Sequence, residues 1–324
     1  MTTTNEPFRA APFIKEIGRG KKGARDMSRE DARTLYTAML ERRVSDLELG
    51  GILIAMRIKG ESVDEIAGFL DAAEAAFERL PDPGGEYAPI IIPSYNGSRQ
   101  MPNLTPLLAL LLARAGAPVL IHGVTKDPGR VTTAEVLREL GHEFATTHEQ
   151  ASAGFAAGRP VFMPIESLAP RLAEMLALRR VLGLRNSTHT LVKIMQPFAC
   201  PALLLTSYTH PDYLEMLGAY FSTAAAVERG DAFLMRGTEG ETVANAKRGQ
   251  QIAWFHEHQR TVLAERQAPT DDTPPLPEAS DAASTARWIE AVLKGKQAVP
   301  GPIGGQIEHC LNVARGLRRR FANG

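Results

Sequence analysis

Basic side chains recur where short apolar runs give way to polar stretches. The apolar run at residues 90–92 precedes the polar stretch 94–103, and the run at 119–121 precedes 122–130. Basic residues also follow a third run, 232–235. Cations spaced along a surface bind nucleic acid through its phosphates, with release of counterions. The cations concerned are Arg99, Lys126, Arg130, Arg236, Lys247 and Arg248, for which scatter over the surface is the competing interpretation.

A second group of cations lies near the amino terminus. Residues 15–25 hold five bases and one acid, whereas residues 271–281 hold four acids and no base. Lys+Arg and Asp+Glu both total 37, so a formal net charge of zero is compatible with one basic face. A solvated terminus explains the cluster equally well. Its members are Lys15, Arg19, Lys21, Lys22 and Arg25.

The other reactive residues form no recognised catalytic or metal-binding pattern. Cys200 and Cys310 lack CxxC spacing, which argues against a disulfide framework and a structural zinc site. His256 and His258 form an H-x-H pair without a third ligand. The basic residues 315–320 suit the last turn of a helix, where they would complement its dipole. The sequence therefore predicts no metal site.

The composition, 44% hydrophobic and 23% charged, is that of an ordinary globular protein. Residues 1–9 are polar and lack the apolar centre of a signal peptide. The most apolar stretch, 104–112, is too short to cross a bilayer. We therefore expect a cytoplasmic protein with no membrane partner.

Two regions differ in their patterning. Residues 1–82 are expected to form a small helical subdomain, in which 1–27 are basic and glycine-containing and could be flexible. Helices are predicted to begin at Ser28, Ser45 and Ser62, each with an acid three residues later. Residues 83–324 alternate apolar runs with helical periodicity, which predicts an α/β domain with a mostly parallel central sheet.

Three segments resemble anthranilate phosphoribosyltransferase. The spacing L-G-x-x-L-x-A-x-R-x-K-G-E-x-x-x-E-x-A occurs at residues 49–67. Residues 179–185, RRVLGLR, are similar to a family segment near the aromatic-acid substrate, and residues 115–123 to the strand before a K-H-G-N-R loop. The resemblance covers nearly the whole chain. It implies the α/β fold of that enzyme and of nucleoside phosphorylase II, with residues 170–200 packed against the helical subdomain.

The chain departs from this family where the family holds diphosphate and magnesium. The G-T-G-G-D-G phosphate loop corresponds to residues 94–99, SYNGSR, which keep one glycine; glycines there let N–H groups approach a pyrophosphate. Residues 121–125, IHGVT, lack the Lys, Asn and Arg of the K-H-G-N-R loop. The acidic magnesium pair is displaced, with Glu239 and Glu241 in another register. These departures predict loss of phosphoribosyl transfer, with no catalytic residue and no cofactor.

Residues 95–120 and 235–241 resemble a divergent branch of the family, known as a homodimer that binds DNA and RNA without sequence specificity. The resemblance implies that the loop cations lie at the carboxyl ends of strands, where α/β sheets place ligands, and that Arg185 and Lys193 line the cleft between subdomains. Contacts to the phosphate backbone carry no sequence information, so DNA and RNA are both expected partners.

Three points stay open at this stage. The implied dimer forms through the helical subdomain, so Leu35, Met39, Leu49 and Leu53 are either interface or core. Tyr95, Phe198 and Tyr208 could stack on unpaired bases, although core packing is the safer interpretation of Phe198. The alternative functions are a phosphoribosyltransferase-like enzyme of altered specificity and a partner-binding dimer without a nucleic-acid role.

Overall fold

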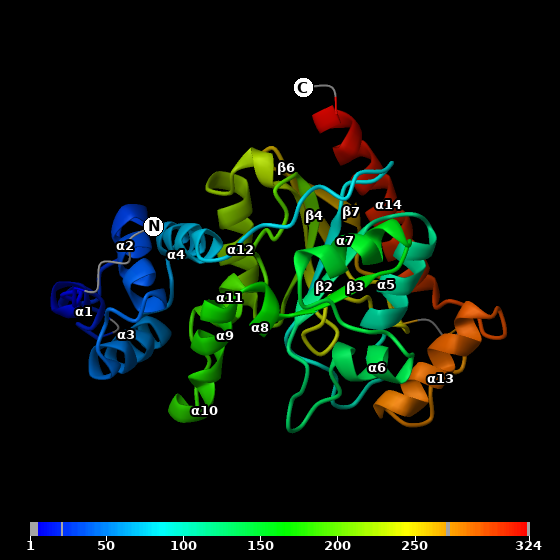
Figure 1. The fold of residues 1–324 in the computed structure, drawn as a ribbon, viewed down its shortest axis with the longest axis horizontal. Helices are drawn as coiled ribbons and strands as arrows, with labels where there is room; N and C mark the ends of the chain where they lie inside the picture. The colour runs from blue at the N-terminus through cyan, green and yellow to red at the C-terminus, as the bar shows by residue number, and fades with distance from the viewer. Residues whose placement is uncertain (1–5, 21, 270–272, 323–324) are drawn as a thin grey trace.

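The computed structural model describes residues 6–20, 22–269 and 273–322, and its sheet stands between a helical subdomain and a layer of further helices (Figure 1). The predicted helix starts are confirmed: the Ser28 hydroxyl accepts from the Asp31 N–H, and Ser45 and Ser62 form complete capping boxes with Glu48 and Glu65. One further helix lies within the segment for which no helix was predicted. The four helices are α1 (Ala11–Ile17), α2 (Arg29–Leu40), α3 (Asp46–Lys59) and α4 (Val63–Ala75).

Seven strands form one sheet in the order β3-β2-β1-β4-β5-β6-β7. The pairs from β3 to β5 are parallel, as predicted, and β5-β6 and β6-β7 are antiparallel. The strands are β1 (Ile90–Ser94), β2 (Val119–Gly123), β3 (Val161–Pro164), β4 (Ala202–Tyr208), β5 (Gly230–Arg236), β6 (Ile252–His256) and β7 (Gln259–Ala264).

The β6-β7 hairpin was missed in the sequence. Its turn is made by Glu257 and His258, both with positive φ (47° and 63°), where hairpin turns usually carry Asn or Gly. Strand β7 is largely exposed, and its first half, residues 259–261, is polar. The hairpin therefore lacks the usual turn residues, and only the second half of β7 is apolar.

Both faces of the sheet are covered. Alternate side chains of β1 enter different cores: Ile91 packs with the helical subdomain, and Ile90 and Ile92 pack on the other side. The second core contains α5 (Thr105–Arg114), α6 (Thr133–Glu139), α13 (Ala282–Leu293) and α14 (Gly301–Ala322). The first contains α7 (His148–Ala156), α8 (Ile165–Leu168) and α12 (Pro211–Thr223). This double burial explains why the parallel strands read as continuous apolar runs.

Short helices connect the sheet to the helical subdomain. They are α9 (Pro170–Ala177), α10 (Arg179–Leu182) and α11 (Thr188–Leu191), with a 3-10 turn, η1 (Val227–Arg229), before β5. Helix α9 contacts α2, and α11 contacts α4. Helices α9 and α10 are separated at Leu178, and Gly183 ends α10 with a left-handed φ of 70°.

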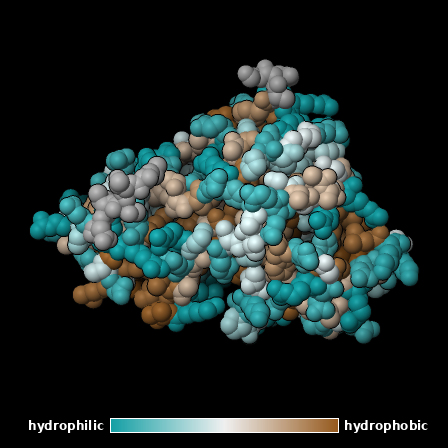
Figure 2. All heavy atoms as spheres, in the orientation of Figure 1, coloured by the Kyte–Doolittle hydropathy of each residue, from teal (hydrophilic) through white to brown (hydrophobic). Residues whose placement is uncertain are grey.

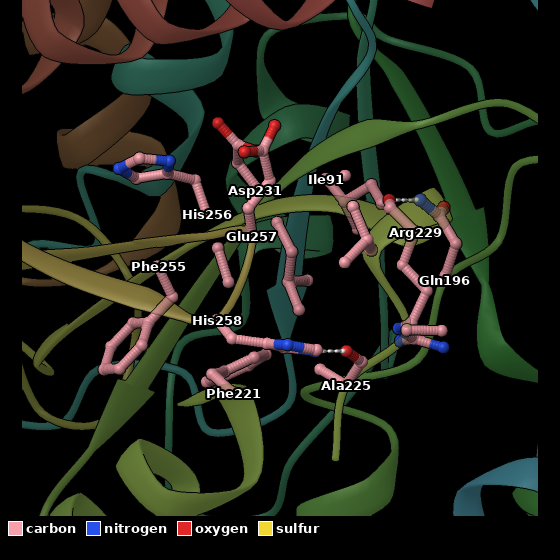
Figure 3. A pocket seen from close by; sticks show the side chains of 15 residues that line it. Ile91, Gln196, Phe221, Ala225, Arg229, Asp231, Phe255, His256, Glu257 and His258 are labelled. Atoms are coloured by element: carbon pink, nitrogen blue, oxygen red, sulfur yellow. Dashed lines mark hydrogen bonds between the residues drawn. The ribbon is translucent and has the colours of Figure 1, made fainter. Parts of the chain in front are cut away.

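A buried ionic group joins the two regions. Glu74, on α4, accepts from the Arg229 guanidinium at 2.5 Å and from the backbone N–H of Gln196 at 2.8 Å. The Gln196 amide donates in turn to the Arg229 carbonyl at 2.7 Å. Figure 3 shows this last bond beside a pocket of about 30 Å³ at the start of β5, where His258 also donates to the Ala225 carbonyl. The group lies at the amino ends of the strands.

None of the described helices combines the length and apolar character that a membrane crossing requires.

Candidate functional site

The direction of strand order changes between β1 and β4, which are neighbours although β1 is also paired with β2. In open α/β sheets, ligands bind outside the carboxyl ends of the strands at such a switch point. Three loops meet there: 95–104 after β1, 124–132 after β2 and 237–251 after β5. Backbone bonds between Ser98 and Val131 tie the first two loops together. We therefore locate the candidate site at this edge of the sheet.

The loop after β1 is tied to the loop after β5 by carboxylates. The Glu241 carboxylate accepts from the N–H groups of Asn96 and Gly97 at 2.9 and 2.7 Å. Glu239 accepts from the N–H groups of Arg99 and Gln100. The acids that the sequence showed in a displaced register are thus folded against the backbone donors of the β1 loop.

Three half-buried cations surround this contact. Arg130 donates to the carbonyls of Gly97 and Glu239, both at 3.2 Å. Arg185 donates to the Asn96 side-chain oxygen at 2.9 Å, and the Lys193 ammonium donates to the Gly240 carbonyl at 3.3 Å. We call Arg130, Arg185 and Lys193 the inner cations. Arg185 and Lys193 lie at the cleft, as the resemblance implied, but their donors are directed to the loops.

A second layer of cations is exposed around the same edge. Arg99, Lys126, Arg236 and Lys247 are exposed, and Arg248 is half-buried. Within the described ranges, neither these five nor the inner cations form an ion pair with an acid. We call Arg99, Lys126, Arg236, Lys247 and Arg248 the outer cations. Their charges are available to an external anion.

One of the outer cations, Lys126, lines a cleft of about 800 Å³ between the β2 loop and helices α9 and α10. Lys126 lies on one wall, and Arg179 and Arg180 lie on the other. Neither Arg179 nor Arg180 forms an ion pair with an acid among the described residues. A smaller pocket of about 140 Å³ is lined by Arg57, Arg185 and Lys193, together with Tyr208 and Tyr213.

Burial and neighbouring positive charge lower the pKa of two of the inner cations. For Lys193, burial is the largest cause; with smaller contributions from Arg185 and Arg130, and against the opposing effect of Glu241, it lowers the pKa to about 8. Burial also lowers the pKa of Arg185, as do Arg179 and Arg130. A cationic site lowers the pKa of its own bases in this way, and an anion bound nearby would raise them.

The amino-terminal cluster is separate from this site. Arg19 pairs with Glu16 at 2.6 Å, and Arg25 approaches the same acid at 3.7 Å. Lys15 and Lys22 are exposed, and Lys21 lies outside the described residues. Figure 1 shows α1 at the end of the helical subdomain away from the sheet. The structure therefore does not bring Lys15, Arg19, Lys22 or Arg25 to the loop edge.

The carboxy-terminal arginines also have other roles. Arg315 pairs with Glu86 at 2.7 Å, Arg318 with Asp82 at 2.6 Å and Arg320 with Asp231 at 2.5 Å. These ion pairs fix α14 to the sheet, whereas the sequence suggested a helix-dipole role. The carboxy-terminal arginines therefore have acidic partners, whereas the outer cations have none among the described residues.

The three aromatic candidates differ in burial. Phe198 is fully buried in the core, as the safer interpretation held. Tyr95 is half-buried and its hydroxyl is bonded to Nδ1 of His122 at 2.7 Å, and Tyr208 is half-buried in the smaller pocket. Only Tyr95 and Tyr208 are accessible enough to meet a ligand.

The buried His122 should make the protein sensitive to acid. Burial lowers the pKa of its imidazole to about 3, below the unfolded value of about 6.5. As pH falls below 6.5, the unfolded chain binds a proton that the folded chain excludes, so stability falls. At pH 5 the loss is about 2 kcal/mol relative to pH 7. Burial also lowers the pKa of His189, to about 4, so His189 adds a loss of its own over the same range. In urea unfolding at both values, His122→Asn should remove only the His122 contribution of about 2 kcal/mol. Tyr95→Phe, which keeps the ring, should retain it, and equal pH dependence in His122→Asn and the parent would contradict the assignment.

Two basic residues of the site were not selected from the sequence. Arg57 and Arg179 lie inside the segments 49–67 and 179–185 that carried the family resemblance. Arg57 donates to the Tyr213 hydroxyl at 3.3 Å. Their positions in these motifs were the available signal. Only the fold brings Arg179 to the cleft lined by Lys126, and Arg57 to the smaller pocket lined by Arg185.

Comparisons with known proteins agree with this architecture. Residues 11–76 match the family model described as "Glycosyl transferase family, helical bundle domain". The chain is 45% identical over 313 residues to "Uncharacterized protein YbiB" of Escherichia coli (strain K12), covering 96% of each chain. It is 26% identical over 300 residues to the anthranilate phosphoribosyltransferase of Shewanella baltica (strain OS195), covering 88% of this chain and 80% of that one.

The solved structures show the same fold. The anthranilate phosphoribosyltransferase from Thermus thermophilus superposes with a TM-score of 0.71 at 19% identity, over 95% of this chain and 90% of that one. The Saccharomyces cerevisiae enzyme in complex with PRPP and Mg superposes with a TM-score of 0.68 at 13% identity, over 95% and 92%. With its helical bundle domain and this fold, the chain belongs to the family that includes YbiB, an anthranilate phosphoribosyltransferase-like family within the glycosyl transferase family 3 fold.

Proposed function

We propose that this protein is a homodimer that binds DNA and RNA without sequence specificity through the phosphate backbone. The observation that carries the proposal is the group of outer cations, which share one edge of the sheet without acidic partners among the described residues. Nonspecific affinity for nucleic acid comes from such cations, because each phosphate contact releases condensed counterions. The inner cations support the loops that carry the outer ones.

Phosphate contacts would follow the cleft between the β2 loop and α10. Lys126 faces Arg179 and Arg180 across it, so a chain of phosphates meets positive charge on both walls. Tyr95 is the aromatic side chain that lines this cleft. An aromatic ring beside a basic track offers a stacking surface to unpaired bases of any sequence. This arrangement favours contact with an unpaired strand in DNA or RNA.

Fluorescence anisotropy with labelled single-stranded DNA of mixed sequence tests the proposal. We expect submicromolar binding at low salt, with log affinity falling linearly as log salt rises, and a similar result with RNA. The slope measures how many phosphates are neutralised. Absence of binding at low salt would refute the proposal.

The proposed dimer uses an apolar face of the helical subdomain. Leu47 and Ile58 on α3 are 88% and 59% exposed, and they border a groove of about 590 Å³ between α1, α3 and Leu182. Figure 2 shows hydrophobic atoms gathered at the lower left, where Figure 1 places α3. Gly50 and Gly51 line the groove, so a second copy can approach the backbone closely. Leu35, Met39 and Leu53, which the sequence left open as interface, are core residues, and Leu49 is half-buried.

Charge on this face should separate the dimer. Leu47→Asp combined with Ile58→Asp places two carboxylates against an apolar surface, so light scattering should report a monomer where the parent protein is a dimer. Val262→Asp is a matched control, because Val262 is 40% exposed on β7, outside this face. A parent protein that is monomeric at micromolar concentration would contradict the proposed interface.

A phosphoribosyltransferase-like enzyme is the second candidate. It is favoured by the fold and by the pocket that joins Arg57, Arg185 and Lys193 to two tyrosines, which suits an aromatic acid. Against it, the β1 loop already donates its N–H groups to Glu239 and Glu241. Calorimetry with phosphoribosyl diphosphate and Mg²⁺ distinguishes the two: binding heat would favour the enzyme, and its absence at millimolar ligand would exclude it.

A further inference from the structure

The β1 loop has the donors of an anion site, and the protein itself supplies the anions. Four N–H groups of residues 96–100 converge on two carboxylates that lie about 140 residues away in the chain. Consecutive N–H groups in a loop commonly bind phosphate or carboxylate. Here Glu241 Oε1 lies between two of them, and Glu239 meets the other two.

The carboxylates are presented by a tight turn. Thr238 and Glu241 exchange both backbone hydrogen bonds, each at 3.0 Å, while Glu239 and Gly240 have φ values of 52° and 96°. Positive φ at both central positions defines a primed hairpin turn. A side chain at Gly240 would place its Cβ 2.1 Å from the side-chain amide nitrogen of Asn96. The turn therefore requires glycine at this position to lie against the β1 loop.

The turn is held from several sides. The Gly240 carbonyl accepts from the Asn96 amide at 2.7 Å, from the Ser207 hydroxyl at 3.0 Å and from Lys193. Arg130 donates to the Glu239 carbonyl. Asn96, Ser207 and Arg130 lie at or after the carboxyl ends of β1, β4 and β2, and Lys193 follows α11. Together they position the turn in the crevice at the switch point.

The Glu241 carboxylate is buried like a bound anion, and only one of its two oxygens is hydrogen-bonded within the described part of the chain. Its side chain is fully buried, and its second oxygen, Oε2, has no hydrogen-bond partner among the described residues. A buried carboxylate with an unpaired oxygen is costly unless its surroundings are cationic. Lys193, Arg130 and Arg185 provide that positive surrounding without a direct ion pair.

We propose that Glu239 and Glu241 act as a built-in anion that occupies the β1 loop and closes it to free phosphate. The loop keeps its ability to bind a phosphate group, but the Thr238–Glu241 turn fills it, and a ligand can enter only if the turn withdraws. The device is independent of whether the outer cations bind nucleic acid. It explains why the β1 loop keeps backbone N–H groups directed at an anion although Gly97 is its one glycine.

Paired variants of equal charge test this device. Glu239→Ala with Glu241→Ala empties the loop, whereas Glu239→Gln with Glu241→Gln keeps an oxygen acceptor for each pair of N–H groups. Thermal unfolding is followed in increasing inorganic phosphate and in sodium chloride of equal ionic strength. Phosphate stabilises proteins in general relative to chloride, and the exposed outer cations remain in every variant, so the comparison is between variants. The alanine pair should start at a lower Tm, and its gain with phosphate over chloride should exceed that of the parent protein and of the glutamine pair by several degrees.

Two results would overturn the proposal. One is a phosphate-specific rise in Tm of the parent protein equal to that of the alanine pair, because the loop would then be open already. The other is a folded alanine pair, verified by circular dichroism, whose gain with phosphate over chloride is no larger than that of the glutamine pair. If the alanine pair does not fold, Glu239→Ala alone serves, since Glu239 is half-buried and its loss frees two N–H groups. Phosphate-specific stabilisation of that variant beyond that of the parent protein supports the device, and its absence refutes it.

Discussion

Reversing two outer cations, Lys247→Glu with Arg248→Glu, should weaken binding to every nucleic-acid sequence by about the same factor. Both residues lie in the loop after β5, and neither has an acidic partner among the described residues. Phosphate contacts are lost and repulsion is added, so we expect roughly 100-fold weaker binding at moderate salt. The slope of log affinity against log salt should fall by about 2. Anisotropy titrations with two unrelated DNA sequences measure both quantities.

A control with the same change in net charge separates local contact from overall charge. Lys294 and Lys296 follow α13 at its end, where Leu293 accepts from Arg114 at the end of α5. Since α5 runs away from the β1 loop, this end lies at the opposite edge of the sheet. Lys294→Glu with Lys296→Glu should change affinity only slightly. Equal losses in the two double variants would remove Lys247 and Arg248 from the binding surface, as would an unchanged affinity in the first.

Replacing Glu74 by alanine should cause the largest loss of stability. Glu74 and the Arg229 side chain are 8% and 15% exposed, so the variant leaves a nearly buried guanidinium without its carboxylate. The Gln196 N–H also loses its acceptor. Removing one partner of a buried ion pair typically costs about 3–5 kcal/mol. Urea unfolding at pH 7 should show a loss of that size. Glu74 joins α4 to the segment before β5, the strand that leads into one of the three loops of the candidate site.

An exposed ion pair provides the comparison. Glu174 pairs with Arg42 at 2.8 Å, but the two side chains are 43% and 69% exposed. Exposed pairs are worth little, so Glu174→Ala should cost below about 1 kcal/mol. Glu74→Gln, which keeps an acceptor of the same length, should fall between the two. A cost for Glu74→Ala as small as that for Glu174→Ala would show that solvent reaches Arg229 and that the joint is not buried.

Much of the local structure of this protein could be predicted from its sequence, because it depends on interactions between residues close together in the chain. Serines followed three residues later by an acid marked the starts of α3 and α4, since the cap and its partner lie within one helical turn. Apolar runs marked β1, β2 and β5, which are covered on both faces and therefore have no polar side. By contrast, α1 and the β6-β7 hairpin carry weaker local signals and depend on their neighbours.

The candidate site could be predicted only in part, because it depends on contacts between residues far apart in the chain. The sequence identified Arg99, Lys126 and Lys247 as cations in loops, but whether a cation is paired depends on acids far away in the chain. Arg318 has its partner in Asp82, whereas the outer cations have none within the described residues. The sequence therefore determined which charges the chain contains, and the tertiary structure decided which of them remain free.

Glu239 and Glu241 illustrate the same division. The sequence showed only that these two acids are displaced relative to the acidic magnesium pair of anthranilate phosphoribosyltransferase. Their contacts with residues 96–100 exist because β1 and β5 flank β4 in the sheet and bring their two loops to one edge. Hydrogen bonds act over about 3 Å, so a contact across 140 residues follows from the strand order and not from local sequence.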